Sequence, residues 1–272
     1  MRKLTMLLAL VTCCGPALAG DLSVNASVER AMFGEHRSEA NIERNRFRHP
    51  VGTLEFFGLK ADMTVLEIWP GAGWYTEVLA PVLRDKGRLV VATWDPDVEG
   101  QPTYRYELPL QMQAMFEAHP GVYDKVETVH YSPPESDSLG EADSYDMILT
   151  FRNTHGWVSG GLAEAIFTEF ARVLKPGGAL GVVQHRAATG SDPAETAQQG
   201  YVSEEAVIDY AEAAGLMFEA SSEVNANPRD TKNYPDGVWT LPPGYRLGDE
   251  DRERYTAIGE SDRMTLRFRK PD

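Results

Sequence analysis

The sequence predicts an α/β fold built on a doubly wound, mostly parallel seven-stranded sheet with helices on both faces. Two observations lead to this fold class. From residue 64 onward, short runs rich in β-branched residues alternate with amphipathic segments, which is the pattern of repeated βαβ units. Residues 64–81, "TVLEIWPGAGWYTEVLAP", have the pattern of a strand, a glycine turn and a helix. Folds of this Rossmann-like type bind nucleotide-like ligands at such a turn.

The seven predicted strands are short and rich in β-branched and aromatic residues. They are residues 64–69, 87–94, 125–131, 145–151, 178–184, 217–224 and 263–269. The helix between the fourth and fifth strands has the clearest apolar spacing. Its apolar face is formed by Ala163, Ile166, Phe167, Phe170, Val173 and Leu174. We expect it to end at "KPGG", residues 175–178, because proline and glycine stop a helix and turn the chain.

Three further features help to define the elements of the predicted domain. A helix is expected after Ser203, a good N-cap residue, and should close at Gly215. Pro81 should kink or shorten the helix that follows the glycine turn. Residues 186–202 and 225–262 fit neither strand nor helix patterns. As long loops after the fifth and sixth strands, they should lie at the edge of the sheet where ligands bind.

The N-terminus carries the three parts of a secretory signal in residues 1–19. Two basic residues, an apolar run and a small-residue cleavage site follow one another in "MRKLTMLLALVTCCGPALA". The apolar run is shorter than the about 20 residues that span a bilayer, which argues against a membrane anchor. Lipid modification at Cys13 is the other alternative, and Thr12 before it fits that poorly. The sequence therefore predicts an exported, periplasmic protein.

Beyond the signal, the chain divides into an arm and a domain. Residues 20–60 are predicted to form an N-terminal helical arm that is polar and has few apolar anchors. Residues 61–272 are predicted to form one domain, because the chain has no internal repeat and no long low-complexity linker.

Charge and cysteine content exclude several classes of partner and site. The formal net charge is −15, and loss of the signal, with two basic and no acidic residues, takes it to −17. Nucleic acids and anionic membrane surfaces are poor partners for so acidic a chain, because they are bound through lysine and arginine. Cys13 and Cys14 both lie in the signal, so no disulfide, thiolate metal site or cysteine nucleophile is expected after cleavage. The oligomeric state is left open.

The glycine turn carries the residues expected to hold a cofactor. Glu67 lies near the end of the strand, and Gly71 and Gly73 let backbone approach a ligand where a Cβ would collide. Asp95, after the second strand, is placed to accept hydrogen bonds from ribose hydroxyls. A dinucleotide fingerprint would need glycine at the position of Thr76, so nicotinamide and flavin cofactors are not expected.

The turn resembles the acidic-x-Gly-x-Gly-x-Gly motif of class I S-adenosylmethionine-dependent methyltransferases, with Glu67, Gly71 and Gly73 in register. The resemblance covers residues 50–272 and includes Asp95, the "YDMILTF" strand and the "ARVLKPGGALGVV" segment. Within that superfamily, the chain is similar to exported predicted methyltransferases with an "EIWPGxGWYTE" turn. The resemblance implies S-adenosylmethionine as the cofactor and a small-molecule substrate as the methyl acceptor.

Trp69 departs from this motif, which has glycine at its position. Pro70 disfavours helical geometry at Trp69, so we expect Trp69 to be extended and the strand to run one residue further. The indole could form a wall beside the cofactor or fill core space, and the core interpretation is favoured. A second departure follows the third strand, where family members often have an acidic residue near the adenine. This chain has Ser132 and Pro133 there.

The candidate catalytic residues follow the fourth and fifth strands: Asn153, His155 and His185. Neighbouring parallel strands end at one edge, so these side chains should meet beside the transferred methyl group. A histidine tuned near neutral pH could act as a base. The alternative is that both histidines are satisfied by backbone partners. No ligand spacing supports metal binding by these two residues and His130.

Other side chains at this edge have two interpretations each. Arg152 could anchor an acidic substrate, but an ion pair with one of the many carboxylates is favoured. Tyr201, Tyr234 and Trp239 could cap an apolar or planar acceptor, or pack the late loops down.

Three functions are compatible with these features. The first, our working prediction, is an S-adenosylmethionine-dependent methyltransferase. The second is an exported non-catalytic protein that keeps the fold and binds another small ligand, which fits the altered Trp69 turn and the cytoplasmic origin of the cofactor. The third is lyase or hydrolase chemistry in the same pocket, using His155 or His185.

Overall fold

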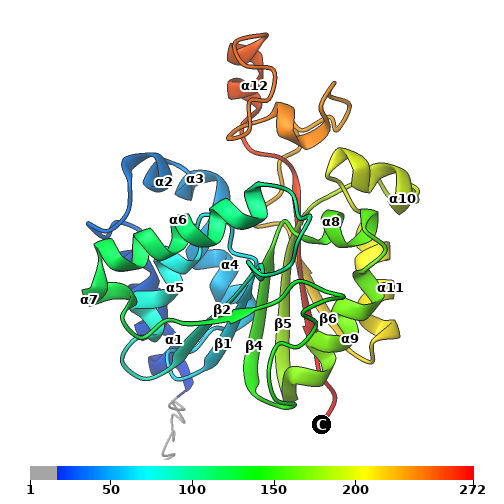
Figure 1. The fold of residues 1–272 in the computed structure, drawn as a ribbon. Coiled ribbons are helices and arrows are strands. Elements are labelled where there is room, and N and C mark those ends of the chain that lie inside the picture. The colour runs from blue at the N-terminus through cyan, green and yellow to red at the C-terminus, as the bar shows by residue number, and fades with distance from the viewer. Residues whose placement is uncertain (1–16) are drawn as a thin grey trace, which may run out of the picture.

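The structure, a computed structural model, describes residues 17–272, with side chains from residue 24 onward. The predicted signal, residues 1–19, lies outside the described residues except for its last three, which begin helix α1 (Ala17–Ala31). All seven predicted strands are present, and they form one sheet in the order β3-β2-β1-β4-β5-β7-β6 (Figure 1). They are β1 (Thr64–Ile68), β2 (Arg88–Thr93), β3 (Glu127–His130), β4 (Tyr145–Phe151), β5 (Leu174–His185), β6 (Met217–Ser222) and β7 (Arg263–Arg269).

The sheet is mixed rather than parallel throughout. The β1–β2, β1–β4, β2–β3 and β4–β5 pairs are parallel, whereas β7 is antiparallel to both β5 and β6. Within the described sheet, β7 therefore runs against all the other strands. Arg263, which begins β7, pairs with His185, which ends β5. The segment before β7 consequently reaches the same edge of the sheet as the carboxyl ends of β1 and β4.

Helices cover both faces of the sheet, as predicted (Figure 1). Successive residues of a strand point to opposite faces, so Val65 packs into one core and Leu66 into the other. The first core is built with α1, α4 (Pro50–Phe57), α5 (Thr76–Leu83), α6 (Tyr104–Ala118) and α7 (Pro120–Tyr123). The second core is built with α8 (Thr154–Ser159), α9 (Ala163–Val173) and α11 (Glu204–Ala213). The remaining helices are α2 (Glu39–Glu43), α3 (Asn45–Arg48), α10 (Pro193–Thr196), α12 (Arg252–Ile258) and the short 3₁₀ segments η1 (Ala197–Gln199) and η2 (Gly237–Thr240).

The two best-defined predicted helices are confirmed. Helix α9 ends at Val173, and "KPGG" forms an irregularity inside β5: Leu174 pairs with Tyr145, but the next paired residue is Ala179, opposite Met147. Helix α11 begins after Ser203, whose hydroxyl accepts a hydrogen bond from the backbone of the first turn.

The N-terminal arm docks on α5 at the place where Pro81 weakens that helix. Proline has no N–H, so the carbonyl of Glu77, four residues earlier, has no helical donor. His36 Nε2 lies 2.8 Å from this carbonyl oxygen and supplies the missing donor. Arg37 also forms a 2.8 Å ion pair with the Glu77 carboxylate. The helix therefore continues through the proline to Leu83, and these polar contacts add to the apolar packing of α1 and α4 in fixing the arm.

The two segments that fitted neither pattern lie above the carboxyl edge of the sheet. Helix α10 follows β5, and η2 and α12 belong to the segment between β6 and β7, which rises from the top of the sheet in Figure 1. Their predicted position at the ligand edge is confirmed. Across residues 17–272, we find no helix long and apolar enough to cross a membrane.

Candidate functional site

A cavity of about 260 Å³ opens at the carboxyl edge of the sheet, over the ends of β1, β4 and β5. Helix α6 and the segment between β6 and β7 complete its walls. It is lined by Trp69, Pro70, Gly71, Trp94, Leu108, Phe151, Arg152, Asn153, His155, His185, Val238, Trp239, Leu241, Pro242, Pro243, Gly244, Glu260 and Ser261. Most of the predicted site residues are thus brought together, and several unpredicted ones join them.

The loop after β1 has a positive backbone φ at all three motif positions. Residues 69, 71 and 73 all have left-handed φ values, +41° at Trp69, +63° at Gly71 and +80° at Gly73. The expectation that Trp69 is extended was therefore wrong, although its N–H still donates to the Ala92 carbonyl at 2.9 Å, one step beyond β1. A left-handed tryptophan is strained by about 1–3 kcal/mol and persists only where its surroundings fix it.

The two glycines have different surroundings. A Cβ on Gly71 would meet open space, and Gly71 lines the cavity. A Cβ on Gly73 would lie 2.7 Å from the terminal methyl carbon of Met115 in α6, and Gly73 does not line the cavity. Gly71 is therefore the position where a ligand could approach the backbone closely, and Gly73 allows the loop to pack under α6.

Glu67 lies beneath the loop rather than in the cavity. Its side chain is buried, and its Oε2 accepts a hydrogen bond of 2.7 Å from Thr76 Oγ1. Burial raises the pKa of Glu67 to about 8, against a small opposing effect of the Thr76 hydrogen bond. Glu67 is thus mostly uncharged at neutral pH and ties β1 to the start of α5.

Asp95 links the ends of β2 and β3 and does not line the cavity. Its Oδ1 accepts from the Asp97 N–H at 3.0 Å and lies 3.8 Å from His130 Nδ1. Its own N–H donates to Ser132 Oγ at 2.8 Å. Asp95 Oδ2 makes no hydrogen bond to any residue that the structure describes, so this oxygen is available to a ligand hydroxyl.

The Trp69 indole is a core side chain that also forms part of the cavity wall. Its Nε1 donates to the Tyr131 carbonyl at 2.9 Å, and its ring stacks on Trp94 at 5.3 Å between centroids. Trp157 meets the same indole edge-on at 5.9 Å. We name Trp69, Trp94 and Tyr131 the aromatic half of the site, since they fill the space between the ends of β1, β2 and β3.

Asn153 is placed to hold the loop in position. Its Nδ2 donates to the Ile68 carbonyl at 2.8 Å and to Thr150 Oγ1 at 3.1 Å, with the Trp69 carbonyl at 3.4 Å. The amide therefore fixes the end of β1 against the end of β4. The structure gives Asn153 a positioning role, in contrast to the catalytic role expected from the sequence.

The two predicted histidines meet in the cavity, with ring centroids 5.9 Å apart. Burial lowers the pKa of His155 to about 4, and burial together with Arg152 lowers the pKa of His185 well below its usual range. Gln184 Nε2 lies 3.4 Å from His155 Nδ1 and donates to the Gly200 carbonyl at 2.9 Å. The expectation of a histidine base tuned near neutral pH is therefore not met, because burial disfavours the charged imidazolium.

Ser261 and Glu260 were not predicted, yet both line the cavity. Ser261 Oγ lies 2.5 Å from His185 Nδ1. Glu260 is shared by three arginines: Arg44 Nε at 2.7 Å, Arg48 Nε at 3.2 Å and Arg263 Nη1 at 3.0 Å. Burial alone would raise the pKa of Glu260, but these arginines together with Arg152 hold it well below its usual range. The antiparallel direction of β7 brings this segment to the edge, and the sequence pattern did not show that direction.

Arg152 is partly buried, lines the cavity and has a left-handed φ of +67°. Within the described part of the chain it makes no side-chain hydrogen bond and no ion pair. The expected ion pair with a carboxylate is therefore absent from residues 17–272. We name Arg152, His155, His185 and Ser261 the polar half of the site.

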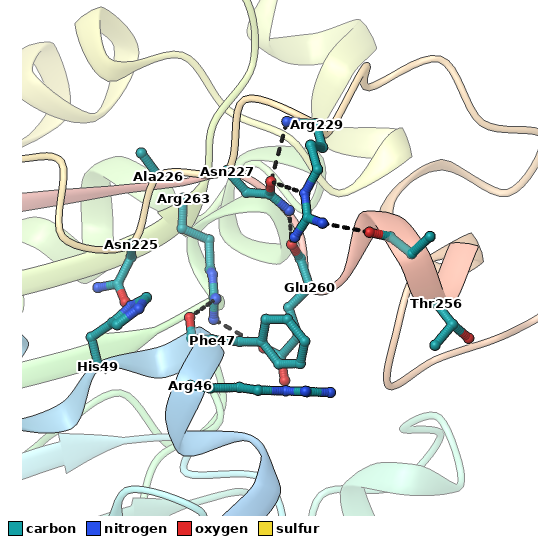
Figure 2. Close-up of a pocket in the computed structure, with 11 residues that line it drawn as sticks. Arg46, Phe47, His49, Asn225, Ala226, Asn227, Arg229, Thr256, Glu260 and Arg263 are labelled. Carbon is teal, nitrogen blue, oxygen red and sulfur yellow. Dashed lines mark hydrogen bonds and ion pairs between the residues drawn. The ribbon is translucent and has the colours of Figure 1, made fainter. Parts of the chain in front are cut away.

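A second pocket of about 420 Å³ adjoins the first, and Glu260 lines both. Figure 2 shows it between the arm, with Arg46 and Phe47, and the segment that carries Asn227 and Arg229. Arg229 Nη1 donates to the Ala257 carbonyl at 2.6 Å, which fixes it on that side. Among residues 17–272, no group of three or more His, Cys, Asp and Glu side chains is placed to hold a metal ion.

Known structures share the fold of this chain. A SAM-dependent methyltransferase from Aquifex aeolicus superposes with a TM-score of 0.52 at 21% identity, over 74% of this chain and 93% of the other. The N-methyltransferase NodS from Bradyrhizobium japonicum, solved with S-adenosylhomocysteine, gives 0.51 at 16% identity, over 92% and 99%. The [4+2]-cyclase SpnF gives 0.56 at 15% identity, over 93% and 95%. The chain thus shares its fold with these proteins, two of which are named as methyltransferases. In sequence, the chain matches no protein-family model and no curated protein.

Proposed function

We propose that this protein is an S-adenosylmethionine-dependent methyltransferase that acts on a small-molecule acceptor. The observation that carries the proposal is the loop after β1, where the three motif positions keep left-handed backbone even at Trp69. Trp69 has a backbone conformation that glycine adopts without strain. This supports the interpretation that the loop is retained for the shape of its backbone. The shared fold with known methyltransferases supports the same function.

The cofactor loop has the features that S-adenosylmethionine requires. Gly71 faces open space at the cavity wall, and Asp95 Oδ2 has no competing partner among the described residues. Gly71, the start of α5 and Asp95 would hold the cofactor, and Trp94 would lie beside it. When bound, the cofactor supplies a sulfonium methyl group open to displacement.

The other cavity residues would align the acceptor and exclude water. Phe151, Trp239 and Leu241 form apolar walls, which favour a desolvated reaction site. His155 is neutral at neutral pH, so its imidazole has one ring N–H to donate. It would orient an acceptor oxygen rather than remove its proton, so catalysis here would rest mainly on alignment.

One observation favours a second candidate, a non-catalytic protein that binds a small ligand on the same fold. The aromatic half is filled by packed side chains, in the region to which the methyltransferase resemblance assigns the adenosine. Such packing narrows the space for the cofactor. The fold neighbour SpnF, a [4+2]-cyclase, is an example of this fold under a name other than methyltransferase.

Calorimetric titration with S-adenosylmethionine and S-adenosylhomocysteine separates the two candidates. A methyltransferase should bind both with dissociation constants of about 1–100 μM. Gly71→Val should weaken binding at least about tenfold, since its side chain enters the cavity. Gly248→Val is the matched control, because Gly248 has nearly the same φ of +64°, faces open space and does not line the cavity. Folded protein that binds neither compound would favour the second candidate.

We also propose that the protein acts in the periplasm after cleavage of residues 1–19. The support is the signal pattern of the N-terminal sequence alone. Mass spectrometry of protein purified from the periplasmic fraction should give a chain that begins at Gly20. A chain that keeps its N-terminus in the cytoplasmic fraction would contradict the proposal.

A further inference from the structure

Arg152 combines two unfavourable features, which the electrostatic attraction of Glu260 offsets only in part. Its left-handed φ of +67° is strained for a residue with a Cβ. Its guanidinium lies in the cavity wall, where burial lowers its pKa to about 10, and it is still protonated at neutral pH. No hydrogen bond or ion pair to residues 17–272 satisfies that charge. Strain and an unpaired cation at one residue indicate a ligand rather than a structural role.

The nearest carboxylate is already engaged by other cations. Glu260 Oε1 accepts from Arg44, and Oε2 accepts from Arg48 and Arg263. Even so, Arg48 Nη2 and Arg263 Nε are buried without a hydrogen-bond partner. Four guanidinium groups thus act on one carboxylate, since Arg152 also influences Glu260 electrostatically. Of these four arginines, Arg152 is the one that lines the cavity, so its charge is left for a ligand to neutralise.

The remaining walls restrict what that ligand is. His155 and His185 are neutral at neutral pH, because burial lowers the pKa of both. Phe151, Trp239 and Leu241 are apolar walls of the same cavity. The cavity has apolar walls and one cation without an ion-pair partner. The ligand that matches it is therefore an apolar molecule with one anionic group.

We infer that the cavity binds a small organic anion, and that Arg152 holds its carboxylate or similar group. As an identification of the methyl acceptor, this inference rests on the proposed function; the binding of the anion does not. The carboxylate could belong to the acceptor or to the amino-acid end of the cofactor, and we assign it to the acceptor because the apolar walls lie beside Arg152. Arg152 is then a substrate-binding residue that sets specificity for acids.

The test compares 3-phenylpropionate with its neutral amide, 3-phenylpropionamide, by titration calorimetry on the purified protein without cofactor. The wild type should bind the acid at least about tenfold more tightly than the amide. Arg152→Met should abolish this preference, and Arg152→Lys should keep part of it. Arg46→Met is the matched control, because it removes an arginine from the second pocket but not from the cavity. Equal binding of acid and amide, or no acid binding at roughly millimolar concentration, overturns the inference.

Two cofactor-derived probes separate the possible sources of the carboxylate. S-Adenosylhomocysteine has the amino-acid carboxylate, and methylthioadenosine lacks it. If Arg152 binds the acceptor, Arg152→Met should change the affinity for both probes by less than about twofold. Selective loss of S-adenosylhomocysteine binding in Arg152→Met would assign the arginine to the cofactor and overturn the acceptor assignment. Failure of the wild type to bind either probe would count against the proposed function but not against anion binding.

A stability measurement distinguishes a ligand role from a structural one. Arg152→Gly removes both the left-handed strain and the unpaired cation, so its melting temperature should rise above that of the wild type while anion binding is lost. A lower melting temperature for Arg152→Gly would show that the arginine stabilises the fold, and the inference would fail. Thermal unfolding followed by circular dichroism measures this difference.

Discussion

The carboxyl edge of the sheet has two halves that differ in the contacts of their side chains. The aromatic half is held by packed rings, and the polar half contains a charged side chain without an ion-pair partner among residues 17–272. In the aromatic half, Trp69 stacks on Trp94 and hydrogen-bonds to the Tyr131 carbonyl, whereas Trp94 Nε1 is buried without a hydrogen-bond partner among residues 17–272. In the polar half, Arg152 has no partner among residues 17–272, and two neutral histidines line the same cavity. Side chains that pack and bond to one another stabilise the fold, whereas unpaired groups beside a cavity indicate a ligand. The anionic ligand group that we propose is assigned to the polar half, because the cation without an ion-pair partner lies there, and the aromatic half is mainly packed core.

The largest expected effect tests whether the aromatic half belongs to the core. Trp69→Ala should lower the free energy of unfolding by about 3–5 kcal/mol, because it removes a buried aromatic side chain. Trp69→Gly should be about 1 kcal/mol more stable than Trp69→Ala, because glycine adopts the left-handed φ without strain. Urea unfolding measures both. The matched control is Trp239→Ala, which should cost well under half as much, because Trp239 is only partly buried at the other side of the cavity. Equal losses of unfolding free energy in Trp69→Ala and Trp239→Ala would contradict the assignment of the aromatic half to the core.

The next effect concerns the carboxyl group beneath the loop. The folded-state pKa of Glu67 is about 8, above the ordinary value of 4.5 for a glutamate, so wild-type stability should fall as pH rises from 4.5 to 8 and level off above that. Glu67→Gln keeps an acceptor for Thr76 and removes the titration. The mutant should match the wild type near pH 4 and exceed it by about 2–4 kcal/mol at pH 9. Urea unfolding across this pH range is the measurement, and a difference independent of pH would refute the buried, neutral state of Glu67.

A smaller effect is expected at Asn153, which joins the two halves. Asn153→Asp replaces a donor by a carboxylate that faces the carbonyls of Ile68 and Trp69. The free energy of unfolding should fall by about 2 kcal/mol. Asn153→Ser, which keeps a donor, serves as the control and should be affected less. If the aspartate variant is as stable as the wild type but inactive, Asn153 has a chemical role that the hydrogen bonds do not show.

The smallest expected effect measures the positive potential of the polar half directly. Burial lowers the pKa of His155 to about 4, and Arg152 contributes a further lowering. Arg152→Met should therefore raise the pKa of His155 by a few tenths to about 1 unit. NMR titration of the imidazole signals gives this value, with Arg46→Met as the control. An unchanged pKa would mean that Arg152 and His155 do not share one electrostatic environment.

The strands, the main helices and the glycine loop could be predicted because their signals are local. Short runs rich in β-branched and aromatic residues marked all seven strands, and Ser203 and Gly215 marked the two ends of α11. The approach of His155 to His185 also followed from the sequence, since the strands before them are neighbours. The charge state of these histidines did not follow, because it depends on burial by segments distant in the chain.

The sequence by itself determined the α/β fold class, the position of the loop after β1 and the edge of the sheet at which the cavity opens. Only the tertiary structure decided which side chains at that edge are free. The antiparallel direction of β7 brings Glu260 and Ser261 to the cavity, and the arm brings Arg44 and Arg48 to Glu260. Arg152 is left unpaired for that reason, contrary to the expected ion pair. Arg44 and Arg48 lie 216 and 212 residues from Glu260 in the chain, and local residue patterns carry no information on such contacts.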